Sequence, residues 1–390
     1  MKIALLCAGL GNIDRGHEVF ARSVFDLLKN DLDITLFKGG GQNKDREVVL
    51  ENIPRYSPLL ADMRLNVSEK WKTSIMEEKR EDVECSTFAY FALKPLLIGS
   101  YDIIHCLERR VAQIIWDHRY LFKNRPRFLF SNGGALARGR LPGCDFIQEY
   151  TEYNLKKGIK AKSFLIPHGV DLTVFDPTIK SDFRSRHNIP PSALTILSVG
   201  KICRWHKRMD YLVKEISKIN GVYLVVVGQE SPDSTAIKDL ASNLMGERAI
   251  FLQMPHEELP QVYKSADIFV LASLSETFGI AYIEAMAMGI PVIASDNTNI
   301  RQILKNQVFI NMKKEGELAK AIKNLGEEKR REISKNGRRV VEEYYDLAKL
   351  KSRYIEMYRK IYESQVKDKR YLFRDKIKNN ICNLLNIKKD

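Results

Sequence analysis

Short runs of apolar residues alternate along the chain with segments in which apolar residues recur every three or four positions. Apolar runs of this length are typical of strands buried in a parallel sheet, and the wider spacing is typical of amphipathic helices. In the first part of the chain the pattern predicts strands at Ile3–Cys7, Ile34–Phe37, Tyr101–Cys106, Arg127–Ser131, Phe146–Gln148 and Phe164–Ile166, and helices near Glu18–Leu28 and Arg110–His118. Because strands and helices alternate, we predict an α/β fold with a doubly wound parallel sheet.

A second alternation follows residues 172–192, a stretch rich in charge and proline that we interpret as a linker. It begins with a strand at Thr195–Val199, a helix at Met209–Ile219 and a strand at Tyr223–Val227. Residues 42–100 show only a few helical patches. A length of 390 residues is more than one ordinary core supports, so we predict two domains.

The stretch from Asp267 to Asp296, DIFVLASLSETFGIAYIEAMAMGIPVIASD, is the most informative part of the chain. It contains a buried strand at Asp267–Ala272, a polar loop, and a helix at Phe278–Met288 built from strong helix formers. Gly289 ends the helix and Pro291 opens the next strand. Two carboxylates, Glu276 and Glu284, stand on either side of the junction between loop and helix.

A loop that leads into a helix at the carboxyl end of a parallel strand can bind an anion, because free backbone N–H groups and the helix dipole point outward there. Gly279 would let a ligand approach the backbone. Glu276 and Glu284, roughly 12 Å apart along the helix axis, could each accept hydrogen bonds from hydroxyl groups. A sugar, a diphosphate and a ribose in a row have that length and pattern.

The pattern Glu276-x7-Glu284, within SETFG and followed by EAMAMGIPVIAS, resembles the signature of the retaining family-4 glycosyltransferases of the GT-B fold, also called glycosyl transferases group 1. The segment Ile166-Pro-His-Gly-Val-Asp171 resembles the one that closes the N-terminal domain in that family, with His168 in place of the usual Asn. The resemblance covers roughly residues 1–40 and 101–362 and is sharp only in the second half.

The resemblance implies two Rossmann-like domains that face a cleft. We predict an acceptor-binding domain at 1–180, a sugar-nucleotide-binding domain at 181–345 and a helix at 346–364 that returns to the first domain. The implied reaction moves a sugar from a nucleoside diphosphate sugar to an acceptor with retained anomeric configuration. In it Glu276 holds the donor sugar, Glu284 lies by the ribose, and the backbone of Thr277, Phe278, Gly279 and Ile280 stabilises the diphosphate.

A basic loop, Gly200-Lys-Ile-Cys-Arg-Trp-His-Lys-Arg208, follows the first strand of the second domain and therefore lies on the cleft face. The family places an Arg and a Lys here on the donor diphosphate. Lys207 matches the Lys. Either Lys201 or Arg204 is the second cation, and both alternatives stay open. Cations here would neutralise charge on the leaving diphosphate.

Gly16, in Arg15-Gly-His-Glu18, resembles the glycine that the family places near the diphosphate, and Gly9 and Gly11 are alternatives. Many relatives carry a His after the strand that matches Arg127–Ser131, where this chain has Asn132. Asn132 cannot serve as a base, so we consider His105 as a catalytic substitute. A buried core role is the alternative for that lone histidine.

Asp31-Leu-Asp33 matches the D-x-D metal motif of a different glycosyltransferase fold, but it sits where a helix ends and a strand starts. We interpret it as turn chemistry and predict no metal requirement and no cofactor. The six cysteines, Cys7, Cys85, Cys106, Cys144, Cys203 and Cys382, have no CxxC or metal spacing and indicate a reducing cytoplasm. We expect most of them to be buried or inert.

The formal net charge of +14 points to nucleic acid, an anionic membrane or a polyanionic substrate. Zinc-finger spacing, RNP-like aromatic motifs and repeats are missing, so we predict no nucleic-acid partner. Residues 365–390 carry a basic amphipathic pattern that would suit an anionic membrane surface, and a solvated helix explains it equally well. The basic cluster of Lys123, Arg125, Arg127, Arg138 and Arg140 lies in the predicted acceptor half. A cytoplasmic enzyme, peripheral on the membrane, would combine these features.

Three alternatives to a glycosyltransferase remain. A sugar-nucleotide epimerase would share the fold, and acceptor-dependent transfer separates the two. A membrane- or polyanion-binding protein could keep the fold without activity, although Glu276, Glu284 and Lys207 are all present. A dinucleotide oxidoreductase is disfavoured because position 14 is Asp, where the G-x-G-x-x-G fingerprint has its third glycine. Base, sugar and acceptor lie beyond what a single sequence specifies.

Overall fold

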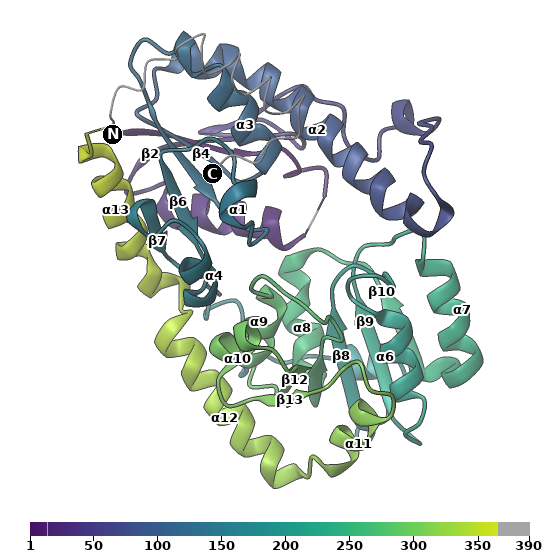
Figure 1. Ribbon diagram of the computed structural model, residues 1–390. Coiled ribbons are helices and arrows are strands. Elements are labelled where there is room, and N and C mark those ends of the chain that lie inside the picture. The colour runs from purple at the N-terminus through teal and green to yellow at the C-terminus, as the bar shows by residue number, and fades with distance from the viewer. Residues whose placement is uncertain (14, 366–390) are drawn as a thin grey trace.

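The computed structural model describes residues 1–13 and 15–365, without the side chains of residues 69–73. The chain forms two α/β halves, one above the other in Figure 1. The helices α12 (Glu327–Tyr344) and α13 (Leu347–Glu363) run along one side of both halves and bring the chain back to the first. The predicted basic tail, 365–390, lies outside the described residues except for its first residue.

The N-terminal half contains a parallel sheet of seven strands in the order β3-β2-β1-β4-β5-β6-β7. The strands are β1 (Lys2–Cys7), β2 (Asp33–Lys38), β3 (Glu47–Val49), β4 (Ile103–Cys106), β5 (Arg127–Ser131), β6 (Phe146–Glu149) and β7 (Ser163–Leu165). In the inner strand β1, Leu5 packs in one cluster with Phe25, while Leu6 packs in another with Phe88. Side chains alternate along a strand, so these two clusters lie on opposite faces of the sheet.

The C-terminal half contains a second parallel sheet, in the order β10-β9-β8-β11-β12-β13. Its strands are β8 (Thr195–Val199), β9 (Tyr223–Val227), β10 (Ala249–Leu252), β11 (Ile268–Val270), β12 (Val292–Ser295) and β13 (Val308–Ile310). Both sheets are covered by helices (Figure 1). The predicted fold class, two doubly wound parallel sheets, is confirmed.

The helices connect the strands as the alternating pattern predicts. Besides α12 and α13 they are α1 (Gly16–Leu28), α2 (Glu69–Gly99), α3 (Arg109–Asp117), α4 (Glu152–Lys157), α5 (Phe183–Arg186), α6 (Met209–Ile216), α7 (Ser234–Met245), α8 (Leu259–Lys264), α9 (Ile280–Ala287), α10 (Thr298–Leu304) and α11 (Glu317–Asn324). The helix of the Asp267–Asp296 stretch, α9, is shorter than predicted because Gly279, with φ of +80°, precedes its first turn.

The long helix α2 is the main element that the sequence pattern did not predict. It occupies most of the polar stretch 42–100. Its residues Cys85 and Phe88 are buried, whereas Tyr90 and Phe91 on the same helix are exposed. Apolar residues on both the buried and the exposed face weaken the helical periodicity, which explains why the helix is hard to recognise.

The crossing helix α13 packs against α1 and β4 of the N-terminal half. Its Tyr358 and Tyr354 hydroxyls reach side chains of β4 and β6, His105 and Gln148 respectively. None of the helices described is long and apolar enough to cross a membrane. The five cysteines among the described residues are free and buried, as expected.

Candidate active site

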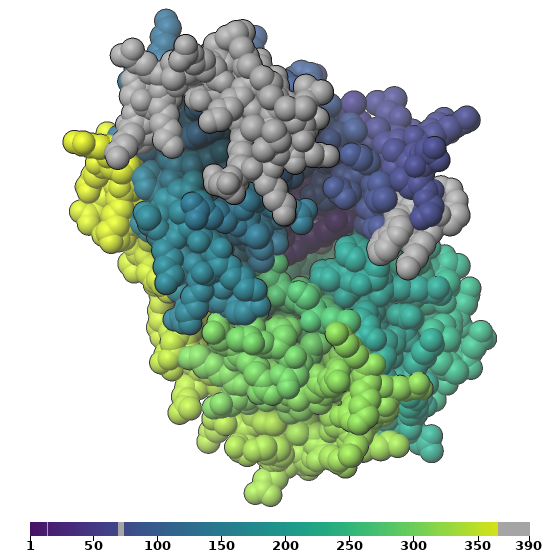
Figure 2. Space-filling view, in the orientation of Figure 1, coloured from purple at the N-terminus to yellow at the C-terminus, as the bar shows by residue number. Residues whose placement is uncertain are grey.

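The loops at the carboxyl ends of β1, β4, β8, β9 and β11 line one cavity between the two halves. Its volume is about 1370 Å³, and Figure 2 shows the hollow between the N-terminal and C-terminal parts. Clefts for a single small ligand usually measure roughly 300–1,000 Å³. The cavity is therefore larger than a single small ligand requires.

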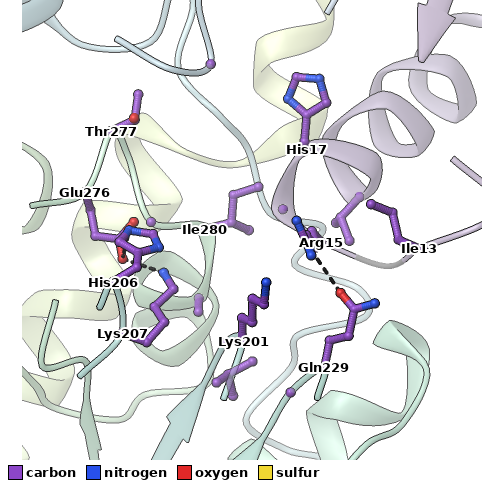
Figure 3. A pocket seen from close by; sticks show the side chains of 18 of the residues that line it. Ile13, Arg15, His17, Lys201, His206, Lys207, Gln229, Glu276, Thr277 and Ile280 are labelled. Atoms are coloured by element: carbon purple, nitrogen blue, oxygen red, sulfur yellow. Dashed lines mark hydrogen bonds and ion pairs between the residues drawn. The ribbon is translucent and has the colours of Figure 1, made fainter. Parts of the chain in front are cut away.

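Glu276 and Lys207 form an ion pair on the C-terminal wall of the cavity (Figure 3). The amide of Asn299 fixes the loop that carries the carboxylate, since its Nδ2 donates to the carbonyls of Glu276 at 2.9 Å and Thr277 at 2.8 Å. His206 Nε2 lies 3.6 Å from the same carboxylate. Both members of the ion pair are largely buried, with 15% of Lys207 and 8% of Glu276 exposed.

The charges around Glu276 keep it ionised. Burial alone would raise the pKa of Glu276, but the nearby Lys207 ammonium and His206 outweigh that effect and lower the pKa below its usual value. Burial and the Lys207 charge lower the pKa of His206. The site thus presents a carboxylate that can accept hydrogen bonds from hydroxyl groups, next to a cation that can bind an anion.

Glu284, on α9, is a second buried carboxylate in the lining. It accepts hydrogen bonds from His256 Nε2 at 2.6 Å and from the Tyr263 hydroxyl at 2.8 Å. Gly279 allows the tight entry into this helix, because a Cβ there would lie 2.5 Å from Cδ2 of the Tyr282 ring. Glu276 and Glu284 therefore flank the start of α9 as two separate acceptor positions in one cavity.

Two polar contacts join the walls across the cavity. Lys201, after β8, pairs with Glu77 of α2. Arg15, just before α1, donates from Nε to Oε1 of Gln229 at 3.0 Å (Figure 3). Lys201, Lys207 and Arg15 thus supply three cations to the cavity, and carboxylates already contact two of them.

Most of the predicted donor-site residues are brought together. The residues that line the cavity are Gly16, Lys201, Lys207, Glu276, Thr277, Phe278, Gly279, Ile280 and Glu284. At Gly16 a Cβ would touch only Ile280 Cδ1, at 3.6 Å, so the space in front of it is open. The roles assigned to these residues stay predictions.

Two of the predicted residues, Arg204 and His105, are not in the lining. Arg204 is exposed, and its backbone N–H donates to Asp233. His105 is fully buried in β4, with Nδ1 2.7 Å from the Tyr358 hydroxyl and Nε2 2.7 Å from Ser131 Oγ. Burial lowers the pKa of His105 to about 3. It is a neutral core residue that α13 covers, and Lys201 rather than Arg204 faces the cavity.

The other candidates have structural explanations. A Cβ at Gly9 would lie 2.3 Å from Oε1 of Glu18, and one at Gly11, where φ is +89°, would lie 2.3 Å from the Gly40 backbone. These two glycines are therefore required by internal packing. Asp31 pairs with Lys351 of α13 at 2.6 Å, which agrees with a structural role for the D-x-D sequence.

The N-terminal wall contains residues that sequence reasoning missed. Arg15, His17 and Glu108 line the cavity. Position alone could have indicated Glu108, because it follows the carboxyl end of β4, where ligands bind in open parallel sheets. Arg15 directly precedes Gly16, the glycine that the resemblance singled out. His256, which contacts Glu284 from 28 residues away, gives no signal in the sequence.

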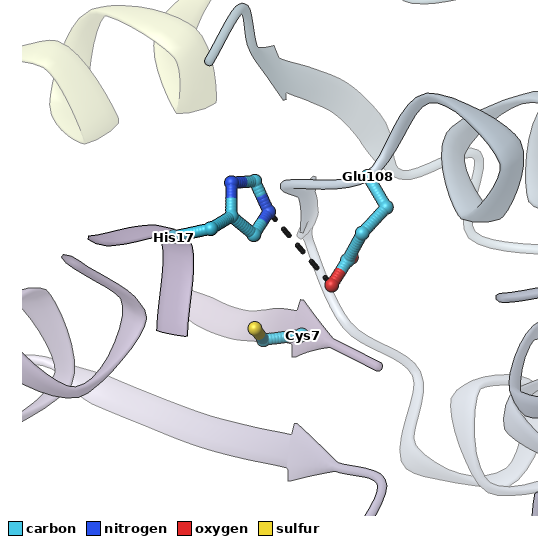
Figure 4. Close-up of side chains that lie close together, drawn as sticks. All are labelled: Cys7, His17 and Glu108. Carbon is cyan, nitrogen blue, oxygen red and sulfur yellow. Dashed lines mark ion pairs between the residues drawn. The ribbon is translucent and has the colours of Figure 1, made fainter. Parts of the chain in front are cut away.

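Among the described residues, Cys7, His17 and Glu108 form the one group that could offer three metal ligands, with the ligand atoms within 4.8 Å of one another (Figure 4). Burial raises the pKa of the Cys7 thiol well above its usual value. A metal would need the thiolate. The three residues come from β1, α1 and the loop after β4, so sequence spacing could not reveal them.

Comparison with known proteins agrees with this geometry. Residues 179–340 match the family model for glycosyl transferases group 1. D-inositol 3-phosphate glycosyltransferase of Mycobacteroides abscessus is 37% identical over 141 residues, which are 35% of this chain and 32% of that protein. Alpha-monoglucosyldiacylglycerol synthase of Streptococcus pneumoniae is 32% identical over 162 residues, 39% of this chain and 36% of that protein. The matched region thus spans about a third of the length of these relatives.

Solved structures resemble nearly the whole chain. Sucrose-phosphate synthase of Thermosynechococcus elongatus has a TM-score of 0.75 at 21% identity, covering 94% of this chain and 100% of that one. Anabaena HepE in complex with UDP-glucose has a TM-score of 0.71 at 14% identity, covering 92% and 99%. WaaG, a glycosyltransferase involved in lipopolysaccharide biosynthesis, has a TM-score of 0.65 at 12% identity, covering 91% and 99%. These likenesses establish the GT-B fold.

Proposed function

We propose that this chain, whose residues 179–340 belong to the glycosyl transferases group 1 family, transfers a sugar from a nucleoside diphosphate sugar to an acceptor hydroxyl. One observation carries the proposal. Glu276, Lys207 and Glu284 line a single cavity at the start of α9. Polar residues of the N-terminal half line the same cavity. Two carboxylates and a cation in one cavity match a ligand with hydroxyl groups at both ends and an anionic centre.

In this proposal each donor group has a partner. The Glu276 carboxylate accepts hydrogen bonds from hydroxyls of the donor sugar, and Glu284 accepts them from the ribose. Lys207 and Lys201 bind the diphosphate, which requires the donor to displace their present carboxylate contacts. The backbone of residues 277–280, at the N-terminus of α9, adds N–H groups to the same anion. UDP-glucose, which HepE binds in a solved structure, has this arrangement of groups.

We propose transfer with retained configuration. The bond between the anomeric carbon and the diphosphate oxygen breaks as the acceptor oxygen bonds to the same face of that carbon. The acceptor proton passes to the departing diphosphate oxygen, so the charges balance. Lys207 and Lys201 stabilise the negative charge that develops on the diphosphate. Since side chains supply these charges, we propose that the reaction needs no metal ion.

The proposal for the acceptor starts from the relatives of this chain. The names of the relatives indicate an inositol phosphate and a glucosylated lipid as their substrates or products. For this chain we propose an acceptor with a free hydroxyl group, lipid-linked or part of a polysaccharide. The basic cluster of residues 123–140 and the tail at 365–390 would then meet an anionic membrane surface from the cytoplasmic side. A sugar-nucleotide epimerase and a GT-B binding protein without activity stay as alternatives.

The test uses the full chain with UDP-, GDP- or ADP-glucose in EDTA. If the proposal is right, one of these donors is hydrolysed, and at an enzyme concentration high enough for release to outpace mutarotation ¹H NMR shows α-glucose as the first product. β-Glucose as the first product would contradict retention, and hydrolysis that appears only after a divalent cation is added would contradict metal independence. A free epimer of the donor would identify an epimerase. If all three donors stay intact and none of UDP, GDP and ADP binds, the transferase proposal is wrong.

A further inference from the structure

We propose that Arg15 is a further catalytic residue, a cation that reaches into the cavity from the N-terminal half and contacts the diphosphate of the donor. This inference rests on the proposed function, because it adds a residue to the same reaction. The ligand class is the diphosphate group of a sugar nucleotide. The leaving group is then held from both walls, by Lys201 and Lys207 on one side and by Arg15 on the other.

The Arg15 side chain lies in the cavity and not against its own helix. Arg15 directly precedes the first turn of α1, and its side chain makes no capping hydrogen bond there. It lines the cavity instead (Figure 3). Nε donates to Gln229 Oε1 at 3.0 Å, and Nη2 donates to the Tyr56 hydroxyl at 2.6 Å. One residue from each half therefore holds the guanidinium group in place.

The charge of Arg15 is not neutralised by an ion pair. Both of its hydrogen-bond partners are uncharged. In the part of the chain that the structure describes, Lys201 and Lys207 each pair with a carboxylate, whereas Arg15 pairs with none. A guanidinium group also has more N–H donors than these two contacts use. A cation of this kind in a cavity attracts an anionic ligand.

Arg15 and Lys201 bring two positive charges toward the same part of the cavity. In Figure 3 the Lys201 side chain extends toward Arg15 from the opposite wall. Burial lowers the pKa of Lys201, and the charge of Arg15 lowers it further, although the contact with Glu77 opposes both effects. The Ile202 N–H donates to the Gln229 carbonyl at 3.0 Å, so the residue that holds Arg15 is tied to the loop of Lys201. An anion between the two cations would relieve their repulsion.

The surroundings of Arg15 suit a diphosphate better than a neutral ligand. Gly16 begins α1 and Ile280 begins α9. A Cβ at Gly16 would lie 3.6 Å from Ile280 Cδ1, so the starts of the two helices are close together. The first N–H groups of a helix favour an anion. The planar guanidinium group can add two parallel hydrogen bonds to phosphate oxygens.

The catalytic role follows from where negative charge develops. When the bond between the anomeric carbon and the diphosphate oxygen breaks, its electron pair stays on that oxygen. The negative charge of the diphosphate therefore increases until the acceptor proton reaches it. A guanidinium group within hydrogen-bond distance stabilises that state more than the intact donor, which lowers the barrier.

The first measurement is the Kd of UDP, GDP or ADP, whichever binds the wild type, by calorimetry in EDTA. These nucleotides carry the charge that the leaving group acquires, so their affinity reports the contact directly. Arg15→Ala should raise the Kd about tenfold or more, because hydrogen bonds to charged groups are lost. Arg15→Lys keeps the charge without the planar fork and should give an intermediate Kd.

The matched control is Arg353→Ala. Arg353 also donates to an uncharged acceptor, the Leu165 carbonyl at 2.6 Å, but it lies outside the cavity lining. Its Kd should equal that of the wild type. Thermal unfolding of each variant checks that the fold is kept.

Gln229→Ala separates a direct contact from a structural one. It removes the hydrogen bond between the two walls but keeps the positive charge of Arg15. If Arg15 contacts the diphosphate, Gln229→Ala should raise the Kd much less than Arg15→Ala does. In addition, guanidinium chloride at millimolar concentration should restore part of the donor hydrolysis of Arg15→Ala, because the free cation can take the vacated place. It should not raise hydrolysis by the wild type.

Three results would overturn the inference. A wild-type Kd in Arg15→Ala, with a wild type that binds the nucleotide, would remove Arg15 from the site and leave the transferase proposal standing. Equal rises of the Kd in Arg15→Ala and Gln229→Ala would show that Arg15 only ties the two halves together. A wild type that binds none of the three nucleotides and leaves all three donors intact would refute the transferase proposal and this inference with it.

Discussion

Replacing Lys207 with Met should destabilise the protein through Glu276. The pair is largely buried, and the substitution leaves the carboxylate without its closest cation. Removing one partner of a buried ion pair costs about 3–5 kcal/mol. Because His206, 3.6 Å away, can compensate in part, we expect a value near 3 kcal/mol. For a domain of this size, each kcal/mol lowers Tm by about 2–4 °C, so Tm should fall by about 6–12 °C.

The stability of the wild type and that of Lys207→Met should change with pH in opposite directions. In the wild type the pKa of Glu276 is below its usual value, so its contribution to stability is present at neutral pH and is lost as the pH falls toward that pKa. In Lys207→Met the buried carboxyl group should have a raised pKa, and stability should be lost as the pH rises. The difference in Tm between the two proteins should therefore be larger at pH 8 than at pH 5.

The assay is thermal unfolding followed by circular dichroism, with two further variants. The double variant Lys207→Met/Glu276→Gln removes the buried charge as well and should recover most of the lost Tm, without regaining nucleotide binding. Arg331→Met breaks the exposed pair with Glu327 and should change Tm little. If the double variant were as unstable as Lys207→Met, the reasoning from an uncompensated buried carboxylate would be refuted.

Three further variants probe other parts of the cavity. Glu284→Gln should raise the nucleotide Kd about tenfold or more, since hydrogen bonds from the ribose to a charged acceptor are worth about 1.5–3 kcal/mol; an unchanged Kd in calorimetry would exclude Glu284 from the ribose site. Glu77→Gln should lower the same Kd severalfold, because it releases Lys201 for the diphosphate; weaker binding would show that Glu77 supports the site instead. Burial raises the pKa of Glu18 from 4.5 to about 8, so wild-type Tm should fall as the pH rises from 4.5 to 8, whereas that of Glu18→Gln should not; parallel pH profiles would contradict that shift.

The fold was readable from the sequence because its strands are buried on both faces. Runs such as those of β1 and β9 are apolar almost throughout, and that is the pattern of a parallel sheet between two helical layers. The long helix α2 was not readable, since apolar residues lie on both its buried and exposed faces. Local periodicity cannot show a helix whose exposed face is also apolar.

Which residues line the C-terminal wall of the cavity was predictable, because they lie at the carboxyl ends of strands that the sequence pattern reveals. Glu276 and Glu284 belong to one strand–loop–helix unit, and Lys207 follows the first strand of the same sheet. The sequence left two alternatives open for His105, because the environment of this residue is set from far away. Tyr358, 253 residues later, reaches its Nδ1 from α13, and no local feature of the sequence indicates that this histidine is covered.

The N-terminal wall of the cavity was hidden for a similar reason. Two of its residues, His17 and Glu108, are separated by 91 positions and come together only because β1 and β4 are neighbours in the sheet. Strand order is a property of the whole fold, so a motif search along the chain does not find such a pair.

The most direct test of the central claim is isothermal titration calorimetry of the full chain with UDP, GDP and ADP in EDTA. The account predicts that one of them binds with one site per chain and that Lys207→Met/Glu276→Gln, which should stay folded, binds it far more weakly. Equal binding by that double variant would place the nucleotide outside the cavity at α9. If none of the three nucleotides bound to the wild type, the proposed donor site would be contradicted.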